Sequence, residues 1–316
     1  MLNKSSHPSL NQMHFNYCFF LRNQEINVAV EGFPALLIGV INALLSPVAV
    51  VGNALILVAI WRNVSFRTPS YVFLAGLAVT DFATGLITQP LYASDILATF
   101  CGRKLSCFAI TTLHTTGRYL AIITVEIITT MSIERWLHMS RRSLLTVRRA
   151  NVICGVLLCL PLPHIVARMW LISIKSYRTL WEPILVAVVG FICFAMTSSS
   201  YLKVFRLIRR HQRQIQSSLS SQNILQPNID LAKYKKSVYT ILFILVIFLL
   251  GYLSHVICVS LSVLLKTSSQ SFAIVLHLSI TLFYTSSSLN PLLYAWRMQD
   301  IRNEVKLLIL KIACKG

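Results

Sequence analysis

The sequence predicts an all-α fold, a seven-transmembrane helix bundle followed by a short amphipathic C-terminal helix in the membrane interface. Only 12% of the 316 residues are charged, which is about half the charged fraction of a soluble globular domain. Hydrophobic residues make up 55% of the chain and gather in long runs. Seven of these runs reach the roughly 20 residues that a helix needs to cross a bilayer.

The expected spans divide the chain into three parts. The spans are 34–61, 70–97, 106–134, 148–172, 182–208, 237–265 and 272–296. The fourth contains Pro161 and Pro163, which a membrane helix tolerates where neighbours satisfy the freed backbone groups. We therefore expect an extracellular N-terminal tail at 1–33 and the helix bundle at 34–296. An amphipathic helix and a short cytosolic tail are expected at 297–316.

The positions of lysine and arginine predict the orientation. Of the 29 basic residues, 20 fall in the connections and tail on one side of the membrane and 8 on the other. Because basic residues accumulate on the cytosolic side, the N-terminus is expected outside the cell, in a multi-pass protein of the plasma membrane. The net charge of +19 then faces the lipid bilayer surface, and no nucleic acid partner is expected.

Both ends of the chain carry candidate modification sites. Asn3 begins the sequon Asn3-Lys4-Ser5, a glycosylation candidate in the outer tail. After the last span, Ile301 and Leu308 share one helix face between charged residues, which is typical of an interfacial amphipathic helix. Cys314 follows it as a palmitoylation candidate, and an unmodified thiol fits the sequence equally well.

The cysteine pattern indicates no metal site. Eight cysteines are scattered along the chain without the spacing of metal ligands. Cys18, Cys101 and Cys107 fall in segments expected outside the cell. One disulfide among these three is compatible with the sequence, which does not select the pair.

Four short polar motifs interrupt the apolar spans, where polar side chains are costly and therefore informative. They are Gly52-Asn53 in the first span, Leu77-Ala78-Val79-Thr80-Asp81 in the second, Glu134-Arg135-Trp136 ending the third, and Asn290-Pro291-Leu292-Leu293-Tyr294 in the seventh. In this order and on these helices, they resemble the motifs of rhodopsin-like (class A) G-protein-coupled receptors. The resemblance covers roughly residues 35–315.

The resemblance implies roles for the matching residues. A buried polar network, which can surround a sodium ion, would comprise Asn53, Asp81, Thr124, Ser286, Ser287 and Asn290. Activation and coupling to a heterotrimeric G protein would involve Glu134, Arg135, Tyr201, Phe248, Tyr252, Pro291 and Tyr294. In relatives, the acid before the arginine holds it in the resting state, and the last tyrosine swings inward on activation. Polarity that serves packing alone is the alternative interpretation.

The chain also departs from the family pattern. Tyr252 and Ser254 replace the tryptophan and proline of the sixth helix, and Gly251 beside them could supply softness. Cys193 replaces the proline of the fifth helix. The loop at about 168–182 contains no cysteine, so the family disulfide to this loop cannot form. Several melanocortin, cannabinoid, sphingosine-phosphate and adenosine receptors share such departures, and the chain resembles that group.

The outer half of the bundle holds the ligand-binding candidates. They are Asp95, His114, Gly117, Arg118, Tyr252, His255 and His277. A cation within a span needs a partner, and for Arg118 this is either Asp95 or an anionic ligand. Gly117 stands where amine receptors of the family place an aspartate, and 272–296 contains no lysine for a retinal Schiff base. Amine ligands and retinal are therefore not expected.

The expected function is that of a receptor which couples an unidentified extracellular ligand to G proteins by allosteric rearrangement of the bundle. The alternatives are a receptor-like protein that binds without signalling, or a channel or transporter. A channel or transporter would need polar residues along one continuous path, and the charged residues within the spans are too few for such a path. No catalytic constellation is visible, so we do not expect an enzyme.

Overall fold

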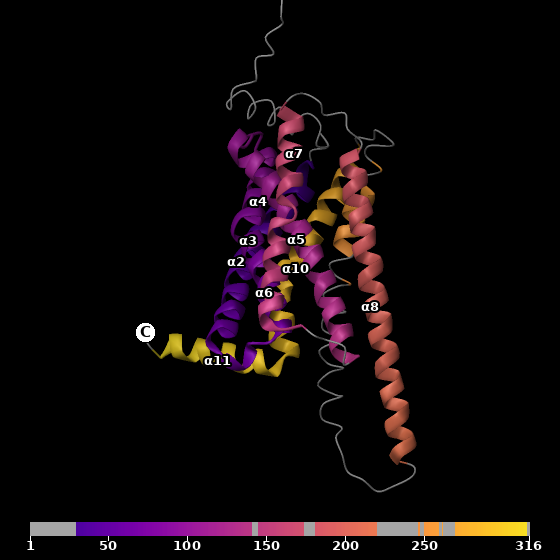
Figure 1. Cartoon of the computed structure of the whole chain (residues 1–316). Helices are drawn as coiled ribbons and strands as arrows, with labels where there is room; N and C mark the ends of the chain where they lie inside the picture. Colours follow the sequence, from indigo (N-terminus) through magenta and orange to yellow (C-terminus); the bar gives the residue numbers. More distant parts are fainter. Residues whose placement is uncertain are drawn as a thin grey trace, which may run out of the picture.

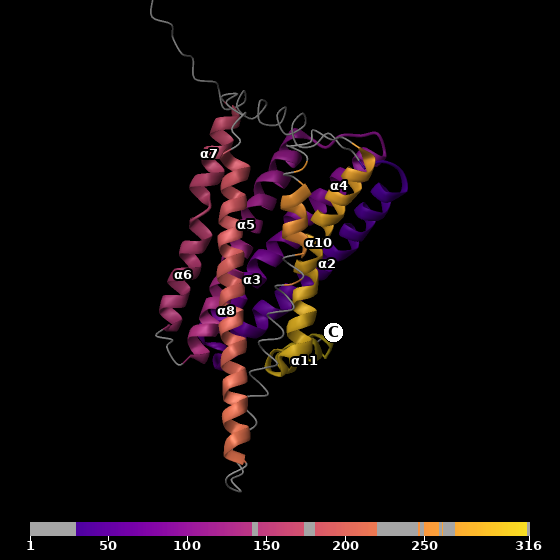
Figure 2. The ribbon, with the colours of Figure 1, turned by 90° about the vertical axis from the view of Figure 1, so that its right-hand side faces the viewer.

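The computed structural model describes residues 30–140, 145–173, 181–219, 246, 250–258, 261 and 269–314. All regular elements in these ranges are helical. In chain order they are α2 (Gly32–Arg62), η1 (Val64–Phe66), α3 (Pro69–Ala83), η2 (Thr84–Thr88), α4 (Gln89–Phe100), α5 (Cys107–Met139), α6 (Val147–Cys159), α7 (Leu162–Ser173), α8 (Trp181–Leu219), α10 (Gln270–Arg297) and α11 (Gln299–Ala313). The long helices run side by side as an elongated bundle, and α11 lies across one end of it (Figures 1 and 2).

Five helical stretches in the described ranges are apolar and long enough to cross a membrane. They are Gly32–Arg62, Pro69–Phe100, Val147–Ala167, Val188–Arg210 and Gln270–Trp296. The 33 residues of α5 also exceed the length that a bilayer requires. Most of the sixth expected span, 237–265, lies outside the described residues, and 250–258 within it is helical.

The third and fifth helices continue beyond the ends that hydropathy predicts. Helix α5 runs to Met139 instead of residue 134, and α8 runs to Leu219 instead of residue 208. Hydropathy marks where a chain leaves the bilayer, whereas arginine, glutamine and leucine continue a helix readily in water. Figure 2 shows the end of α8 projecting beyond the rest of the bundle.

The fourth expected span is divided into α6 and α7. The division lies at Leu160 and Pro161. Proline has no N–H, and its ring clashes with the carbonyl four residues earlier, so the helix is interrupted there. The second half begins again when the N–H of Ile165 donates to the Pro161 carbonyl at 3.1 Å.

A π-helical turn, η2, joins α3 to α4. The N–H of Gln89 donates to the Thr84 carbonyl, five residues back. The next bond of this kind would run from residue 90 to the Gly85 carbonyl, but Pro90 has no N–H. The hydroxyl of Ser46 on α2 donates to that carbonyl instead, at 2.8 Å. The turn therefore ties the second span to the first.

The close packing at this turn depends on a glycine. A Cβ atom added at Gly85 would lie 2.7 Å from the Ala49 Cβ on α2. Helices α2 and α3 also share a buried core with α5, α8 and α10, in which Phe73, Ile123 and Tyr294 are almost fully buried. Large apolar side chains are exposed on the outside, including Leu44 at 67% and Phe191 at 71%. An exposed apolar surface of this kind suits contact with lipid.

Helix α11 has the amphipathic character that its sequence predicts. Ile301 and Leu308 are buried, whereas Leu307 and Leu310 are exposed. The helix packs against α2 and α10, and Figure 1 shows it across the end of the bundle. A hydrogen bond of 2.7 Å from the Asn63 amide to Glu304 fixes α11 to the connection after α2.

Two of the three cysteines that are expected outside the cell differ in the structure. Cys107 at the start of α5 is disulfide-bonded, whereas Cys101 is an exposed free thiol. The candidate lipidation site, Cys314, is exposed after the end of α11. Asn3 and Cys18 lie outside the described residues.

Candidate functional site

A buried polar network joins three helices at one depth in the bundle. The Asn290 amide of α10 donates to the Asp81 carboxylate of α3 at 2.7 Å. On α2, the Asn53 amide donates to the Ala49 carbonyl at 2.8 Å and to the Ser287 carbonyl at 3.1 Å. Asn53, Asp81 and Asn290 are all at most 3% exposed. The predicted core of the network is therefore brought together.

The glycine before Asn53 allows α2 to approach α10. A Cβ atom at Gly52 would lie 2.8 Å from the ring of Pro291. The Gly52-Asn53 motif thus combines a close helix contact with the amide that bridges it. Pro291 lies within the continuous helix α10.

The hydroxyl members of the network face different partners. Thr124 of α5 donates to the Thr80 hydroxyl at 3.2 Å, and Ser286 donates to the Phe283 carbonyl at 2.6 Å. Ser287 is 4% exposed and lies beside Asp81. The Ser287 hydroxyl is thus directed to the Asp81 carboxylate, whereas the Thr124 and Ser286 hydroxyls donate to other groups.

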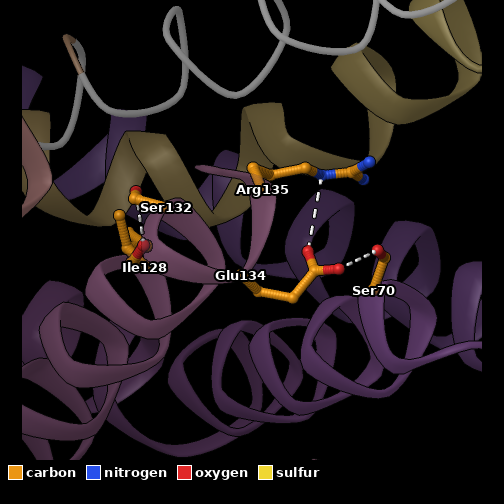
Figure 3. Close-up of polar contacts among 5 residues, drawn as sticks. All are labelled: Ser70, Ile128, Ser132, Glu134 and Arg135. Atoms are coloured by element: carbon orange, nitrogen blue, oxygen red, sulfur yellow. Dashed lines mark hydrogen bonds and ion pairs between the residues drawn. The ribbon is translucent and has the colours of Figure 1, made fainter. Parts of the chain in front are cut away.

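The C-terminal part of α5 holds the second cluster (Figure 3). One carboxylate oxygen of Glu134 accepts a hydrogen bond from the Ser70 hydroxyl of α3 at 2.9 Å. The other lies 3.8 Å from the Arg135 Nε. Glu134 is 4% exposed, and charges at this distance in a low dielectric interact strongly. Glu134 therefore joins Arg135 to the second span.

Two tyrosines of the predicted activation set are buried, Tyr201 close to Arg135 and Tyr294 close to Asp81. Tyr201 of α8 and Tyr294 of α10 are 7% and 1% exposed. Within the part of the chain that the structure describes, neither hydroxyl makes a hydrogen bond of good geometry, and the Ser132 hydroxyl beside Tyr201 donates to the Ile128 carbonyl instead. The role in activation that the resemblance implies for both tyrosines stays a prediction. Phe248 lies outside the described residues.

The half of the bundle that is expected to face outward contains an aromatic cluster between α4 and α10. The Tyr92 hydroxyl is 2.8 Å from the His277 Nδ1, and the two rings stack at 5.9 Å. Tyr284 packs edge-on against Tyr92 at 5.3 Å. A Cβ atom at Gly117 would lie 3.0 Å from Thr88 and 3.4 Å from the Tyr284 hydroxyl. Gly117 therefore permits close contact with α10.

The other ligand-binding candidates lie in two places. Arg118 of α5 lies within electrostatic range of the Tyr252 hydroxyl. His114 precedes Arg118 by one turn, and His255 follows Tyr252 by one turn. Asp95 of α4 interacts in the same way with Tyr92. The structure thus associates Arg118 with the sixth span and Asp95 with the aromatic cluster.

Several buried or half-buried polar residues were not singled out from the sequence. Asn42 of α2 donates to the Thr281 hydroxyl of α10 at 3.0 Å, and Ser46 and Ser70 make the bonds described above. Gln89 is fully buried, and among the described residues neither atom of its amide has a partner. Asn42, Ser46 and Asn53 recur at helical spacing, a periodicity that could have identified this face of α2.

Comparison with known proteins places these motifs in a family. Residues 52–294 match the family model of the 7 transmembrane receptor (rhodopsin family). The high-affinity lysophosphatidic acid receptor of Xenopus laevis is 24% identical over 309 residues, covering 84% of this chain and 80% of the receptor. The human neuromedin-U receptor 2 is 26% identical over 279 residues, covering 78% of this chain and 65% of that receptor. The adenosine receptor A3 of Ovis aries is 24% identical over 298 residues, covering 87% of this chain and 89% of that receptor.

These relatives are receptors for different ligands, so they support the receptor class without identifying the ligand. Members of this family are multi-pass proteins of the plasma membrane and are not enzymes. Their fold is a seven-helix bundle, in agreement with the helical architecture described here. The chain therefore belongs to the rhodopsin family of seven-transmembrane receptors, as a cell-surface G-protein-coupled receptor.

Proposed function

We propose that the receptor has an extracellular N-terminus and transmits ligand binding in the outer half to a heterotrimeric G protein at the inner ends of α5 and α8. The observation that carries this proposal is the Ser70–Glu134–Arg135 cluster at the inner end of α5. In one arrangement of the bundle Glu134 holds the Arg135 guanidinium, and another arrangement can release it. A ligand that binds these arrangements unequally shifts their populations.

The charge of the long fifth helix supports the same orientation. Arg206, Arg209 and Arg210 are exposed near its C-terminal end, and the Lys203 ammonium lies 4.1 Å from the centre of the Trp136 ring at the end of α5. Basic residues near the ends of spans favour the cytosolic side. The same arginines would face a G protein or the anionic inner leaflet.

The test is agonist-independent activation of a panel of Gα subtypes in transfected cells. Wild type, Arg135→Ala and Arg103→Ala are compared at matched surface expression. Arg103 is exposed in the connection between α4 and α5, so its replacement controls for the loss of one positive charge. We expect the basal signal to be lost only in Arg135→Ala. A full basal signal from Arg135→Ala would contradict the role of this cluster.

For the ligand, we propose a molecule that carries negative charge and contacts Arg118. Two observations support this class: the guanidinium lies in the outer half of α5 near Tyr252, and one relative is a receptor for lysophosphatidic acid, which carries a phosphate group. The alternative remains an internal partnership with Asp95.

Lysophosphatidic acid is the probe for this proposal. We expect Arg118→Ala to lose potency, and Arg118→Lys to keep part of it because the charge remains. Asp95→Asn is the control. If Arg118 and Asp95 form an internal pair, Arg118→Ala and Asp95→Asn should lower surface expression to the same extent. Unchanged potency in Arg118→Ala at normal expression would exclude the contact.

We also propose that a sodium ion modulates the network at Asp81. Its carboxylate and the neighbouring Ser287 hydroxyl are oxygen ligands of the kind that hard cations prefer, and Thr124 and Ser286 could add hydroxyls by rotating. The thermal stability of the purified receptor should rise when sodium replaces potassium at equal ionic strength. The rise should disappear in Asp81→Asn, and a rise that persists there would place the ion elsewhere.

A further inference from the structure

Helix α8 packs against α5 through one stripe of buried residues. They recur at helical spacing and are at most 7% exposed: Thr197, Tyr201, Val204 and Ile208. The Thr197 hydroxyl donates to the Thr129 hydroxyl of α5 at 3.2 Å, and the other three belong to the core that α8 shares with α5. The helix continues past Ile208 to Leu219, and Figure 2 shows this end projecting beyond the bundle. The projecting part, 209–219, therefore depends for its position on the contacts just before it.

Lys203 makes a contact beside this stripe. Its side chain is exposed, and its ammonium lies 4.1 Å from the centre of the Trp136 ring of α5. A cation within about 6 Å of a ring centre is attracted by the negative face of the ring, and tryptophan offers the strongest such face. Trp136 is half-buried and lies one turn before the end of α5 at Met139. The contact thus joins the two helices at the last turn of α5.

The position of Trp136 in the chain relates this contact to the charged cluster of α5. Trp136 directly follows Arg135, whose Nε lies 3.8 Å from the Glu134 carboxylate. Tyr201, which precedes Lys203 by two residues, lies within electrostatic range of Arg135. Helix α8 therefore approaches this part of α5 with one buried side chain, Tyr201, and one exposed side chain, Lys203.

A second contact between a cation and a ring has a different geometry. The Arg209 guanidinium lies 4.3 Å from the centre of the Phe205 ring, one turn away on the same helix. A contact within α8 cannot hold α8 against another helix. Residues 203–219 also contain no aspartate or glutamate with which Lys203 could pair along its own helix. The Trp136 ring is therefore the interhelical partner of Lys203.

We propose that the Lys203 ammonium and the Trp136 ring form a clamp that positions the projecting part of α8, 209–219, for contact with the G protein. Its role in coupling rests on the proposed signalling function. A G protein that binds at the inner ends of α5 and α8 contacts both helices at once. If the end of α8 moves freely, the complex has to order it, and the cost of ordering weakens binding. Lys203 and Trp136 are therefore positioning residues, which act through the placement of α8.

The test is a double-mutant cycle on the purified receptor, measured by amide hydrogen exchange in 209–219. Lys203→Met removes the ammonium and keeps an apolar stem, and Trp136→Leu removes the ring. Arg206→Met is the matched control, because Arg206 is also exposed on α8 and its replacement removes the same charge. Lys203→Arg is the conservative variant, since a guanidinium also binds an aromatic face. A neutral detergent without anionic lipid ensures that no phosphate group takes the place of the ring.

We expect Lys203→Met to accelerate exchange in 209–219 about two- to fivefold, the change that corresponds to the ~0.5–1 kcal/mol of an exposed cation–π contact. Lys203→Met should add nothing in the Trp136→Leu background, because the ring is already gone. Arg206→Met and Lys203→Arg should stay close to the wild-type rate. No acceleration in Lys203→Met, an equal acceleration in Arg206→Met, or additive effects of the two clamp substitutions would overturn the clamp.

Basal G-protein activation at matched surface expression separates the clamp from signalling. Lys203→Met should lower the basal signal by about the same two- to fivefold factor, and Lys203→Arg should keep it. A basal signal that is unchanged in Lys203→Met despite faster exchange would overturn the positioning role. If the wild type activates no Gα subtype while the exchange cycle behaves as expected, the clamp is supported and the proposed coupling is refuted.

Discussion

The hydroxyl of Ser46 is expected to stabilise the π-helical turn of the second span, and Ser46→Ala should lower the stability of the receptor. The Gly85 carbonyl accepts from Ser46 at 2.8 Å, and its next donor along the π-helical pattern is absent because residue 90 is proline. Ser46 is 8% exposed, so alanine leaves a buried carbonyl without a donor. An unsatisfied buried carbonyl lowers the free energy of unfolding by ~1–3 kcal/mol.

The measurement is thermal unfolding of the purified receptor in detergent. A loss of this size lowers the midpoint by roughly 2–4 °C for each kcal/mol in a domain of 150–250 residues, so we expect a fall of a few degrees. Ser199→Ala is the matched control, because Ser199 is exposed and its hydroxyl donates to the Met196 carbonyl of its own helix at 2.9 Å. A midpoint for Ser46→Ala equal to that of Ser199→Ala would refute the reasoning.

A second substitution tests the cause of the loss. Pro90→Ala restores an N–H at the position from which a π-helical bond to Gly85 would come. In the double variant this N–H can replace the serine hydroxyl, so part of the lost stability should return. If Pro90→Ala and Ser46→Ala lower the midpoint additively, the proline is not the reason that Gly85 needs Ser46.

Three further substitutions have expected outcomes of their own. One carboxylate oxygen of Glu126 in α5 is buried without a partner among the described residues, so Glu126→Leu should raise the unfolding midpoint, and a lower midpoint would reveal an unseen partner. Gln89→Leu should leave stability unchanged or raise it for the same reason, and a loss of more than ~1 kcal/mol would indicate that its amide is bonded. Asn63→Ala removes the bond to Glu304, which should accelerate hydrogen exchange in α11. If exchange there stays at the wild-type rate, apolar packing alone holds the helix.

The sequence alone determined the class of the molecule, because its signals are local. A bilayer requires long apolar runs, so the spans and the amphipathic character of α11 can be read without a structure. Polar residues inside spans are rare, so Asp81, Asn290 and Arg135 stood out at once. Helix ends and interruptions were less well determined, as at Pro161, because hydropathy does not report where backbone hydrogen bonds stop.

Only the tertiary structure decided which partner each polar or small residue has. Asp81 and Asn290 are 209 positions apart, and Ser70 reaches Glu134 only because α3 and α5 pack with one particular rotation. In the sequence Gly190 is one glycine in an apolar run, and only the structure shows that the Tyr252 ring covers it. Contacts of this kind depend on the register and rotation of helices relative to one another, which the periodicity of a single helix does not encode.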